Sequence, residues 1–582
     1  MKSFIYSKSI KLLLVIPFLF ISLVSNAQIL NPNLILSSGG TGDDDTPKIT
    51  YDNEGNSYCV AVYEEAPFFN HILVPTFGSD NIILSKYNSE GTFMWGKTIA
   101  YGYLIGLNSL SWTNGKLLMS GFFRNSLAFR LTQNEIPDTL EYSGFYYDPF
   151  IAEFDDDGTL LNKMSFDYKN VNEITGIKYF GPNILIFGYF EDTLQFNKEN
   201  PNSSNTITSA GESDIFVACL DPNFNLVWAK RMGGPSYDNI YGIDIYKDDI
   251  YITGSFVNQI DFNTPSSGSS NVLTSYGHGD IFIAKLDKYG NPKWFKRAGS
   301  SSDENYIGES SETGCDIFVN KHGVYLIGAA YNQAHFNGPQ DPDFTIFNTS
   351  TNSLKHFLAL YSHKGSIQWV KELQTEIVFF PPVIHGTDDY IVINESFRDN
   401  LTLYSTYYQD SIRFIPKGYF DHLTRIFDYN GNFVSGASLG SSSNDYVYDL
   451  YTSDNQIYVT GSFKDVCYFN DELYPQSFVV SNGSYDIFIA RYDVPNFIFD
   501  PGETENYVLK LFPNPAQTQI TITNSSEQIG LKYVLYDITG KNIFQGELTQ
   551  NTNFINVSDL KQGIYFVEVL TNKPTTLKFV KY

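Results

Sequence analysis

Cysteine is scarce in this sequence, and its few cysteines form no pattern that indicates a metal or redox site. The 582 residues include four cysteines, none of them in a Cys-x-x-Cys pair. A zinc or dithiol site is therefore not expected. Four cysteines in separate segments are most simply buried free thiols, with one disulfide as the alternative in an oxidising envelope. They are Cys59, Cys219, Cys315 and Cys467.

Basic residues are few relative to acidic ones. The chain has 38 lysines and arginines against 64 aspartates and glutamates, which gives a net charge of −26 and an isoelectric point of about 4.6. Such a charge repels phosphate backbones and anionic lipid headgroups. It therefore argues against nucleic acid as a partner, and it favours solubility or cation binding.

Recognisable catalytic motifs are missing as well. The eight histidines show no metal-binding spacing, and no Ser-His-Asp order stands out. Residues 436–440 have the Gly-x-Ser-x-Gly form of a nucleophile elbow, but that elbow needs a strand-to-helix turn and this segment falls in an expected strand. Paired carboxylates for glycoside hydrolysis are defined by their separation in space, so the sequence leaves that activity open.

The chain has one long apolar run, Leu12–Val24, near its start. Three lysines accompany it, and Ser25-Asn26-Ala27 follows with small residues where signal peptidase cleaves. We expect residues 1–27 to be a signal peptide that is cut between Ala27 and Gln28. The alternative, a membrane anchor, fits less well because the run is short and a cleavage site follows it.

Most of the chain between residues 34 and 493 consists of copies of one repeat. Its clearest copy is Ile250–Gly299, which reads IYITGSF, a polar loop, DIFIAKLD, a KYGN turn and PKWFKRAG. A fixed period of this length is typical of repeat architectures. The DIFIA-type segment occurs seven times at intervals of 65 to 75 residues, starting at Asp80, Asp148, Asp214, Asp280, Lys355, Asp421 and Asp486.

Each copy contains four short runs rich in Ile, Val, Tyr and Phe, separated by Gly, Asn, Asp and Ser clusters. This pattern indicates strands and turns, and no segment shows a sustained helical period. The repeat therefore predicts an all-β fold with a seven-bladed β-propeller of four-stranded blades over residues 28–497. A β-solenoid or a string of sandwiches is the alternative, but a solenoid rung is shorter and one four-stranded meander cannot bury both faces alone.

The two ends of the array predict a closed ring. The segment LILSSGGTGDD at residues 34–44 resembles the outer strand and crossover VWAKRMGGPSYD at residues 227–238. The last copy ends at Tyr492 without a clear outer strand. We therefore expect the N-terminal strand to complete the last blade, which removes an open edge.

Acidic residues recur in two places within the repeat. The segment Asp155–Gly158 looks like part of a calcium loop, but it aligns with Asp287–Gly290 and is interpreted as a hairpin turn. The second recurrence either caps the crossover as an Asx-turn or forms a carboxylate ring that binds a cation such as Ca²⁺; no other cofactor is indicated. Four residues after the crossover glycine stand Asp44, Asp238, Asp303 and Asn444.

Aromatic residues gather in the loops between the second and third strands of each copy. In a meander these loops lie on the same side as the crossovers, so they mark a candidate binding face. Exposed rings there would stack on sugars or anchor a protein partner, or else they cover the blade edges. The candidate ligand-binding residues are Tyr146, Tyr147, Tyr407 and Tyr408.

The composition changes at Tyr507, after a polar linker at residues 498–506. Alternating apolar residues with Gly and Asn turns predict a small Ig-like β-sandwich of about seven strands over residues 507–582. The tail contains LKLFPNP, YVLYDITGK, LKQGIYFVEV and a terminal LKFVKY.

On these motifs the tail resembles the type A C-terminal sorting domain of the type IX secretion system of Bacteroidetes. The resemblance implies the type IX secretion machinery as a partner, passage through the periplasm, and release or attachment at the cell surface. The repeats resemble, more loosely, secreted bacterial propeller repeats of the SBBP type. Neither resemblance supplies a ligand.

These features predict a secreted or cell-surface propeller that binds a glycan or a protein without catalysis. The alternative is a secreted polysaccharide hydrolase or lyase with its site on the loop-rich face. We expect no transmembrane span in the mature chain.

Overall fold

The structure is a computed structural model in which the chain forms two compact units, Met1–Val494 and Pro495–Tyr582. The expected signal peptide with Ala27 and Gln28, and the linker at 498–506, lie outside the residues that the structure describes. Those residues are 29–129, 136–142, 147–166, 172–196, 205–262, 271–300, 312–331, 334–336, 345–347, 354–376, 381–405, 410–453, 455–470, 477–494, 510–512, 515–523, 531–538, 541–550, 552–570 and 575–582.

The described residues form an all-β protein and contain no α-helix. Among them, no helix offers an apolar stretch long enough to cross a membrane. The strands coincide with the runs of β-branched and aromatic residues, which suit a pleated, half-buried surface.

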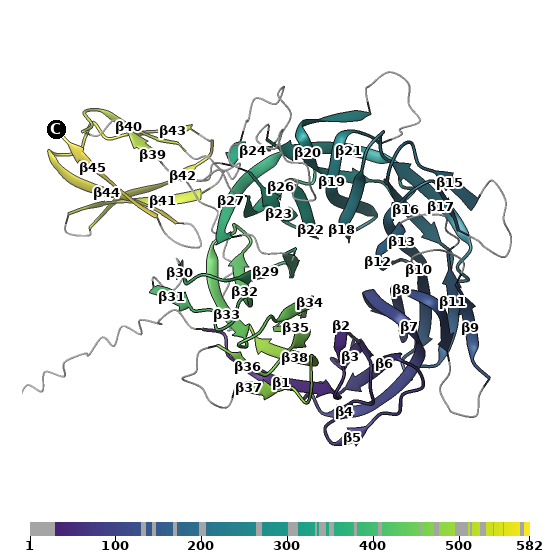
Figure 1. Ribbon diagram of the computed structural model, residues 1–582. Coiled ribbons are helices and arrows are strands. Elements are labelled where there is room, and N and C mark those ends of the chain that lie inside the picture. The colour runs from purple at the N-terminus through teal and green to yellow at the C-terminus, as the bar shows by residue number, and fades with distance from the viewer. Residues whose placement is uncertain are drawn as a thin grey trace, which may run out of the picture. The chain divides into compact units, whose positions relative to one another are not determined.

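In the first unit, antiparallel sets of four strands follow one another around a common centre (Figure 1). The first strand of each set lies nearest that centre and the fourth lies outermost. The long β7 (Phe93–Thr113) is the fourth strand of one set and the first of the next. The first two sets are β2 (Asp44–Tyr51), β3 (Ser57–Tyr63), β6 (Asp80–Tyr87) and β7, then β7, β8 (Lys116–Phe129), β10 (Asp148–Asp155) and β11 (Leu160–Ser165).

The later sets keep the same order. One is β12 (Asn172–Phe180), β13 (Asn183–Phe190), β16 (Asp214–Leu220) and β17 (Leu226–Met232), followed by β18 (Asp238–Tyr246), β19 (Asp249–Asp261), β20 (Val272–Leu286) and β21 (Pro292–Gly299). Then come β22 (Thr313–Asn320), β23 (Gly323–Ala330), β26 (Lys355–Tyr361) and β27 (Ile367–Glu376), and β28 (Val383–Gly386), β29 (Tyr390–Phe397), β32 (Asp421–Asp428) and β33 (Phe433–Gly440).

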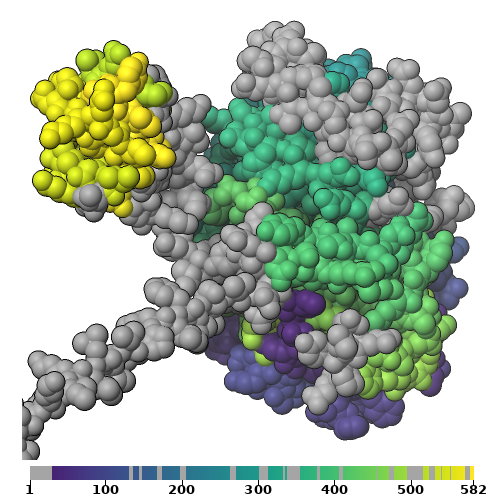
Figure 2. All heavy atoms as spheres, turned by 90° about the vertical axis from the view of Figure 1, so that its left-hand side faces the viewer, coloured from purple at the N-terminus to yellow at the C-terminus, as the bar shows by residue number. Residues whose placement is uncertain are grey.

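The last set is completed by the first strand of the chain. β34 (Tyr446–Ser453), β35 (Gln456–Phe463) and β38 (Asp486–Asp493) are followed in the sheet by β1 (Pro32–Gly39). β1 pairs antiparallel with β38, with Leu34 opposite Arg491 and Ser38 opposite Ile487, as the sequence predicts. Figure 2 shows the purple N-terminal residues beside the yellow-green residues of this set.

Short hairpins extend several sheets outward. They arise from the loops between second and third strands. Three of them pair with the fourth strand of the preceding set and so tie neighbouring sets together, whereas two others form separate two-stranded sheets. β24 (Ala334–Phe336) pairs with β21, β36 (Val466–Phe469) with β33, and β4 (Phe68–Phe69) with β1. The other hairpin strands are β5 (Ile72–Leu73), β9 (Asp138–Glu141), β14 (Thr193–Gln195), β15 (Thr206–Thr208), β25 (Thr345–Phe347), β30 (Leu401–Ser405), β31 (Asp410–Phe414) and β37 (Phe478–Val480).

The hydrophobic core lies between neighbouring sets. β3, β23 and β29 are buried along their whole length because another sheet covers each face. In β19, Ile252 packs in a cluster with Val217 of the preceding set, whereas Tyr251 packs in another with Leu326 of the following set. Burial on both faces explains why the apolar runs of the repeat are continuous.

A tryptophan on the outer strand packs on a turn of the next set, and we call this contact the tryptophan latch. Trp228 of β17 covers the turn glycine Gly290, whose added Cβ would lie 2.6 Å from the indole. In that turn Asp287 Oδ1 accepts hydrogen bonds from the backbone amides of Tyr289 and Asn291 at 2.9 and 2.8 Å. The Asp-x-x-Gly segments are thus Asx-turns at the junctions, and Asp155 binds the following amides in the same way.

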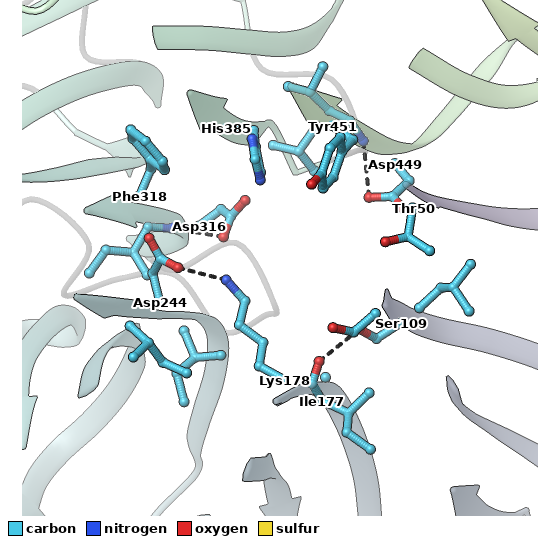
Figure 3. Close-up of a pocket in the computed structure, with 18 of the residues that line it drawn as sticks. Thr50, Ser109, Ile177, Lys178, Asp244, Asp316, Phe318, His385, Asp449 and Tyr451 are labelled. Atoms are coloured by element: carbon cyan, nitrogen blue, oxygen red, sulfur yellow. Dashed lines mark hydrogen bonds and ion pairs between the residues drawn. The ribbon is translucent and has the colours of Figure 1, made fainter. Parts of the chain in front are cut away.

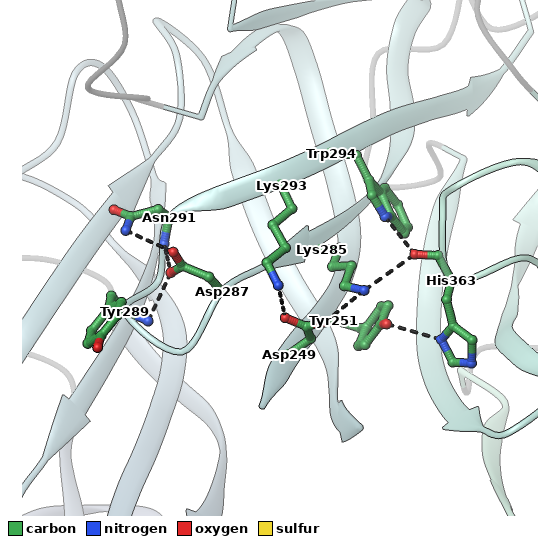
Figure 4. A network of polar contacts seen from close by, with 9 residues as sticks. All are labelled: Asp249, Tyr251, Lys285, Asp287, Tyr289, Asn291, Lys293, Trp294 and His363. Atoms are coloured by element: carbon green, nitrogen blue, oxygen red, sulfur yellow. Dashed lines mark hydrogen bonds and ion pairs between the residues drawn. The ribbon is translucent and has the colours of Figure 1, made fainter. Parts of the chain in front are cut away.

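Figure 4 shows the latch at the next junction. Trp294 Nε1 donates to the carbonyl oxygen of His363 at 3.1 Å, and the Tyr251 hydroxyl contacts His363 Nδ1 at 3.1 Å. Lys285 Nζ lies 2.8 Å from Asp249 and anchors the inner end of this network. The recurring Trp-x-Lys strand of the sequence therefore serves contact between sets.

We expect Gly290→Ala to destabilise the first unit by roughly 2–4 kcal/mol, because it adds backbone strain at φ 74° to a clash with Trp228. Gly115→Ala is the matched control, since Gly115 has φ 77° but no atom within 4 Å of the added Cβ. Urea unfolding of both variants measures the difference. Equal losses of unfolding free energy in the two variants would show that the contact with Trp228 does not contribute to stability.

The second unit is a sandwich of two antiparallel sheets. Ile520 and Leu535, from different sheets, pack together in its core with Val567 and Phe579. One sheet has the order β39 (Lys510–Phe512), β40 (Gln519–Thr523) and β43 (Thr552–Asn556); the other has β42 (Asn542–Leu548), β41 (Leu531–Asp537), β44 (Gly563–Leu570) and β45 (Thr575–Lys581).

Candidate functional site

A cavity of about 510 Å³ lies where the first strands of the sets meet (Figure 3). Its volume falls within the range of small-molecule sites. The wall mixes charged, hydroxyl and aromatic side chains, and every set contributes to it from its first strand. Lining residues include Thr50 of β2, Ser109 and Trp112 of β7, Lys178 of β12, Asp244 of β18, Asp316 and Phe318 of β22, His385 of β28, and Asp449 and Tyr451 of β34.

Three aspartates of the cavity wall bind the backbone of a neighbouring set. These bonds hold each carboxylate in one position and also join adjacent first strands. The contacts run from Asp244 Oδ2 to Val319 N (2.7 Å), from Asp316 Oδ2 to Ile384 N (3.1 Å) and from Asp449 Oδ2 to Ile49 N (2.9 Å).

Lys178 places positive charge at the cavity. Lys178 points into it in Figure 3, with Nζ 2.8 Å from Asp244 Oδ1. Burial lowers the pKa of Lys178, but the carboxylates of Asp244, Asp316 and Asp449 together outweigh burial and leave the pKa above its ordinary value. Lys48, which precedes the wall residues Ile49 and Thr50 in β2, donates to the carbonyl oxygen of Tyr448 at 2.9 Å.

Burial shifts the pKa of two further wall residues. It raises the pKa of Asp316 to about 7, against the backbone amides of Ile384 and Ile317. It lowers the pKa of His385 to about 4, so this imidazole is neutral. His385 Nδ1 lies 2.7 Å from Thr452 Oγ1, which itself donates to the Gly386 carbonyl oxygen at 2.9 Å. His385 Nδ1 therefore donates to Thr452, and Nε2 is left as an acceptor.

The structure describes one of the four predicted aromatic residues. Tyr146, Tyr407 and Tyr408 lie outside the described residues. Tyr147 is 43% exposed and packs edge-on against Phe122 with ring centroids 5.1 Å apart. Three of the described hairpins pair with preceding sets, which favours the edge-covering interpretation for those loops. The hairpin β30–β31, on either side of Tyr407 and Tyr408, forms a separate two-stranded sheet.

The predicted metal residues Asp44 and Asp238 are each fully buried at a separate junction. Asp44 Oδ2 accepts from Gly40 N at 3.0 Å and Asp238 Oδ2 from Gly234 N at 2.7 Å, which is the Asx-turn interpretation. Asp303 lies outside the described residues. Within the described ranges, no three His, Cys, Asp or Glu side chains are placed to hold a metal ion together.

At two other crossovers, the residue that accepts the hydrogen bond from the backbone amide is not the one that the sequence comparison of the repeats indicated. Asp445, rather than Asn444, accepts from Ser441 N at 2.6 Å. Glu312 accepts from Ser300 N at 2.6 Å, later in the chain than Asp303. The four cysteines are buried and free, as the simpler interpretation expected.

The central cavity residues were also missed, because they share no motif. The first strands are the least regular part of the repeat, and the equivalent wall position holds Lys178, Phe318 or His385 in different copies. The usable signal would have been that charged residues interrupt strands that are otherwise apolar.

Comparisons with known proteins identify the second unit. No curated protein matches the sequence. PorZ, a surface component of the type IX secretion system of Porphyromonas gingivalis, is 10% identical over 95% of this chain and all of its own, with a TM-score of 0.18. A DUF4221 family member from Bacteroides vulgatus is 11% identical over 68% of this chain and 95% of its own, with a TM-score of 0.29. Such scores carry no argument about function.

Residues 510–581 match the family of secretion system C-terminal sorting domains. The matched range spans both sheets of the second unit, from β39 to β45. The chain therefore carries a type IX secretion sorting domain and is a protein exported to the cell surface or the medium.

Proposed function

We propose that the first unit is a seven-bladed β-propeller that binds a glycan in its central cavity without catalysing a reaction. The mature protein would begin at Gln28 and reach the cell exterior through its sorting domain. Seven sets of four strands can be traced in the sheet order, with β7 shared and β1 completing the last set, which supports the blade count.

The composition of the cavity wall supports a neutral, hydroxyl-rich ligand. Lys178 is paired with Asp244, so neither charge is free to select a counter-ion. Phe318 and Tyr451 offer aromatic faces on which a sugar ring can stack. The wall carries both hydrogen-bond donors and acceptors, which a polyhydroxyl ligand can use.

The observation that carries this proposal is the fixed position of the polar groups. Asp244, Asp316 and Asp449 are each held by backbone amides of a neighbouring set before any ligand arrives. A site whose polar groups are already oriented loses little conformational freedom on binding. Tyr147 and the other loop tyrosines are proposed as outer contacts for a longer glycan.

A glycan array probed with the mature chain tests the proposal, and each hit is then titrated against Lys178→Met. We expect the variant to bind at least about tenfold more weakly, since it leaves Asp244 without its cation and removes a donor. Lys321→Met is the control, because Lys321 is half exposed and contacts only surface aspartates. Equal affinity of both variants would place the ligand elsewhere.

A second candidate function, polysaccharide hydrolysis, is favoured by Asp316. Its pKa of about 7, raised by burial, suits a general acid at neutral pH. Asp244 and Asp449 supply further carboxylates in the same cavity. Release of reducing ends from the array hits, abolished by Asp316→Asn, would replace the binding proposal; saturable binding without release would support it.

A further inference from the structure

Buried acidic pairs lie at four junctions between sets. One member stands at or just before the start of a first strand, and the other lies in the third strand of the preceding set, at its first residue in three of the four pairs. All eight side chains are at most 1% exposed. The pairs are Asp44 with Asp486, Asp238 with Asp214, Glu312 with Asp280, and Asp445 with Asp421.

Backbone hydrogen bonds place the two members of a pair next to each other. Asp44 N donates to the carbonyl oxygen of Tyr485 at 2.9 Å, and Tyr485 immediately precedes Asp486. Asp238 N donates in the same way to Ser213 at 2.8 Å, and Ser213 precedes Asp214. The carboxyl groups of each pair therefore start from adjacent points of neighbouring sets.

Both members of these two pairs have one carboxyl oxygen without a partner. At the first junction, Oδ2 of Asp44 accepts from Gly40 N and Oδ2 of Asp486 from Asn482 N, each at 3.0 Å. The Oδ1 atoms of both residues are buried and accept no hydrogen bond, and the same holds for the Oδ1 atoms of Asp214 and Asp238.

The packing around the pairs leaves the carboxyl groups no room to turn away. A Cβ added at Gly39 would lie 2.2 Å from Asp486 Cγ, and one added at Gly233 would lie 2.4 Å from Asp214 Cγ. The crossover glycines are therefore needed because the carboxyl group of the preceding third strand lies against them.

The charged groups around the pairs do not favour two ionised carboxylates. Asp44 faces Asp486 and Glu64, and it also lies near the phenol of Tyr63. Asp238 faces Asp214, which is held by Arg231 with Nη1 2.5 Å from Oδ2. Two adjacent buried carboxylates destabilise a fold strongly, whereas one shared proton would occupy both unpartnered oxygens.

We propose that each of two pairs, Asp44 with Asp486 and Asp238 with Asp214, shares one proton. The shared proton is then a pH-sensitive link between neighbouring sets. The proposal is independent of the glycan ligand. The Glu312 pair is left out, because both Glu312 oxygens already accept from Ser300 and Tyr331.

The direction of the pH dependence follows from the pKa shifts. Burial, reinforced by the carboxylate of the partner, raises the pKa of Asp44 and of Asp238 to about 8. An acid whose pKa is raised by folding contributes stability that is complete below its unfolded pKa of about 3.9. That contribution is lost as the pH rises through about 8.

Thermal melting of the mature full-length protein between about pH 6 and about pH 9.5 tests this link between the carboxyl pairs. We expect the wild-type Tm to fall by roughly 5 °C or more, and to fall less in Asp44→Asn and Asp238→Asn. Asparagine keeps the shape and donates to the partner without titrating. Asp43→Asn, at an exposed neighbouring position, should keep the wild-type profile.

Two outcomes would overturn the proposal. One is the same loss of Tm in the wild type, in Asp44→Asn and in Asp238→Asn. The other is a wild-type Tm that about 5 mM Ca²⁺ restores at alkaline pH, with no such response in Asp44→Asn, since a cation would then bridge the pair. If the variants fail to fold, infrared spectroscopy of the wild type decides, because a shared proton requires a protonated-carboxyl band near pH 6 that disappears as the pH rises.

Discussion

A chain that lacks residues 29–40 is expected to melt roughly 5–10 °C below the intact protein and to aggregate as its concentration rises. β1 pairs with β38 from Pro32 to Ser38, although the two strands lie near opposite ends of the first unit in sequence. Removal of β1 therefore leaves β38 with an open edge. It also removes Leu34 from its contact with Gly91 and the Asn33 side chain from Arg491, whose Nε lies 3.0 Å away.

Differential scanning calorimetry with light scattering measures both effects. Deletion of residues 575–582 is the control, because it removes the single strand β45 from the second unit and should leave melting of the first unit unchanged. If the chain without residues 29–40 melts with the wild type, β1 adds no stability and the closure argument is wrong.

Truncation after Val494 is expected to leave the protein in the periplasm, with surface and medium fractions at background. The removed residues carry the whole sorting domain. They form a compact unit with a hydrophobic core of its own, so the first unit does not need them to fold. Cell fractionation with immunoblotting measures the distribution.

A melt of the purified truncated protein separates missorting from misfolding. Its transition should match that of the first unit in the full-length chain. Normal surface display of the truncated chain would show that residues 510–581 are not needed for export.

The sequence predicted the strand pattern because both faces of the middle strands are buried. Continuous runs such as IYITGSF stand out against polar turns and repeat at a regular interval. The pairing of the N-terminal strand with the last copy could be predicted for a related reason. The segment at 34–40 has the composition of an outer strand, and β38 has no outer partner within its own copy.

The loops and the cavity could not be predicted in the same way, because they depend on contacts between copies. The aromatic residues Phe68 and Phe69 lie in one of these loops, and they pair with β1, which belongs to the sheet of the last set. The cavity forms where all the first strands meet, so no single copy contains it. Lys178 and Asp244 lie in different copies, and their pairing requires the closed arrangement.

One alignment error has a local cause. The crossover of the last set begins with Gly440 and Ser441 in place of two glycines. Counting four residues from Gly440 gives Asn444. The amide that forms the hydrogen bond is instead that of Ser441, and its acceptor is Asp445. Hydrogen-bond partners, rather than glycine spacing, define the equivalent position.

Hydrogen exchange of the mature protein with and without a saturating array-selected glycan is the most direct test of where the ligand binds. The proposed site predicts protection in peptides that cover β12, β18, β22 and β34, whose residues line the cavity. Protection confined to the outer hairpins β4–β5 and β30–β31, with the first strands unchanged, would contradict binding in the central cavity.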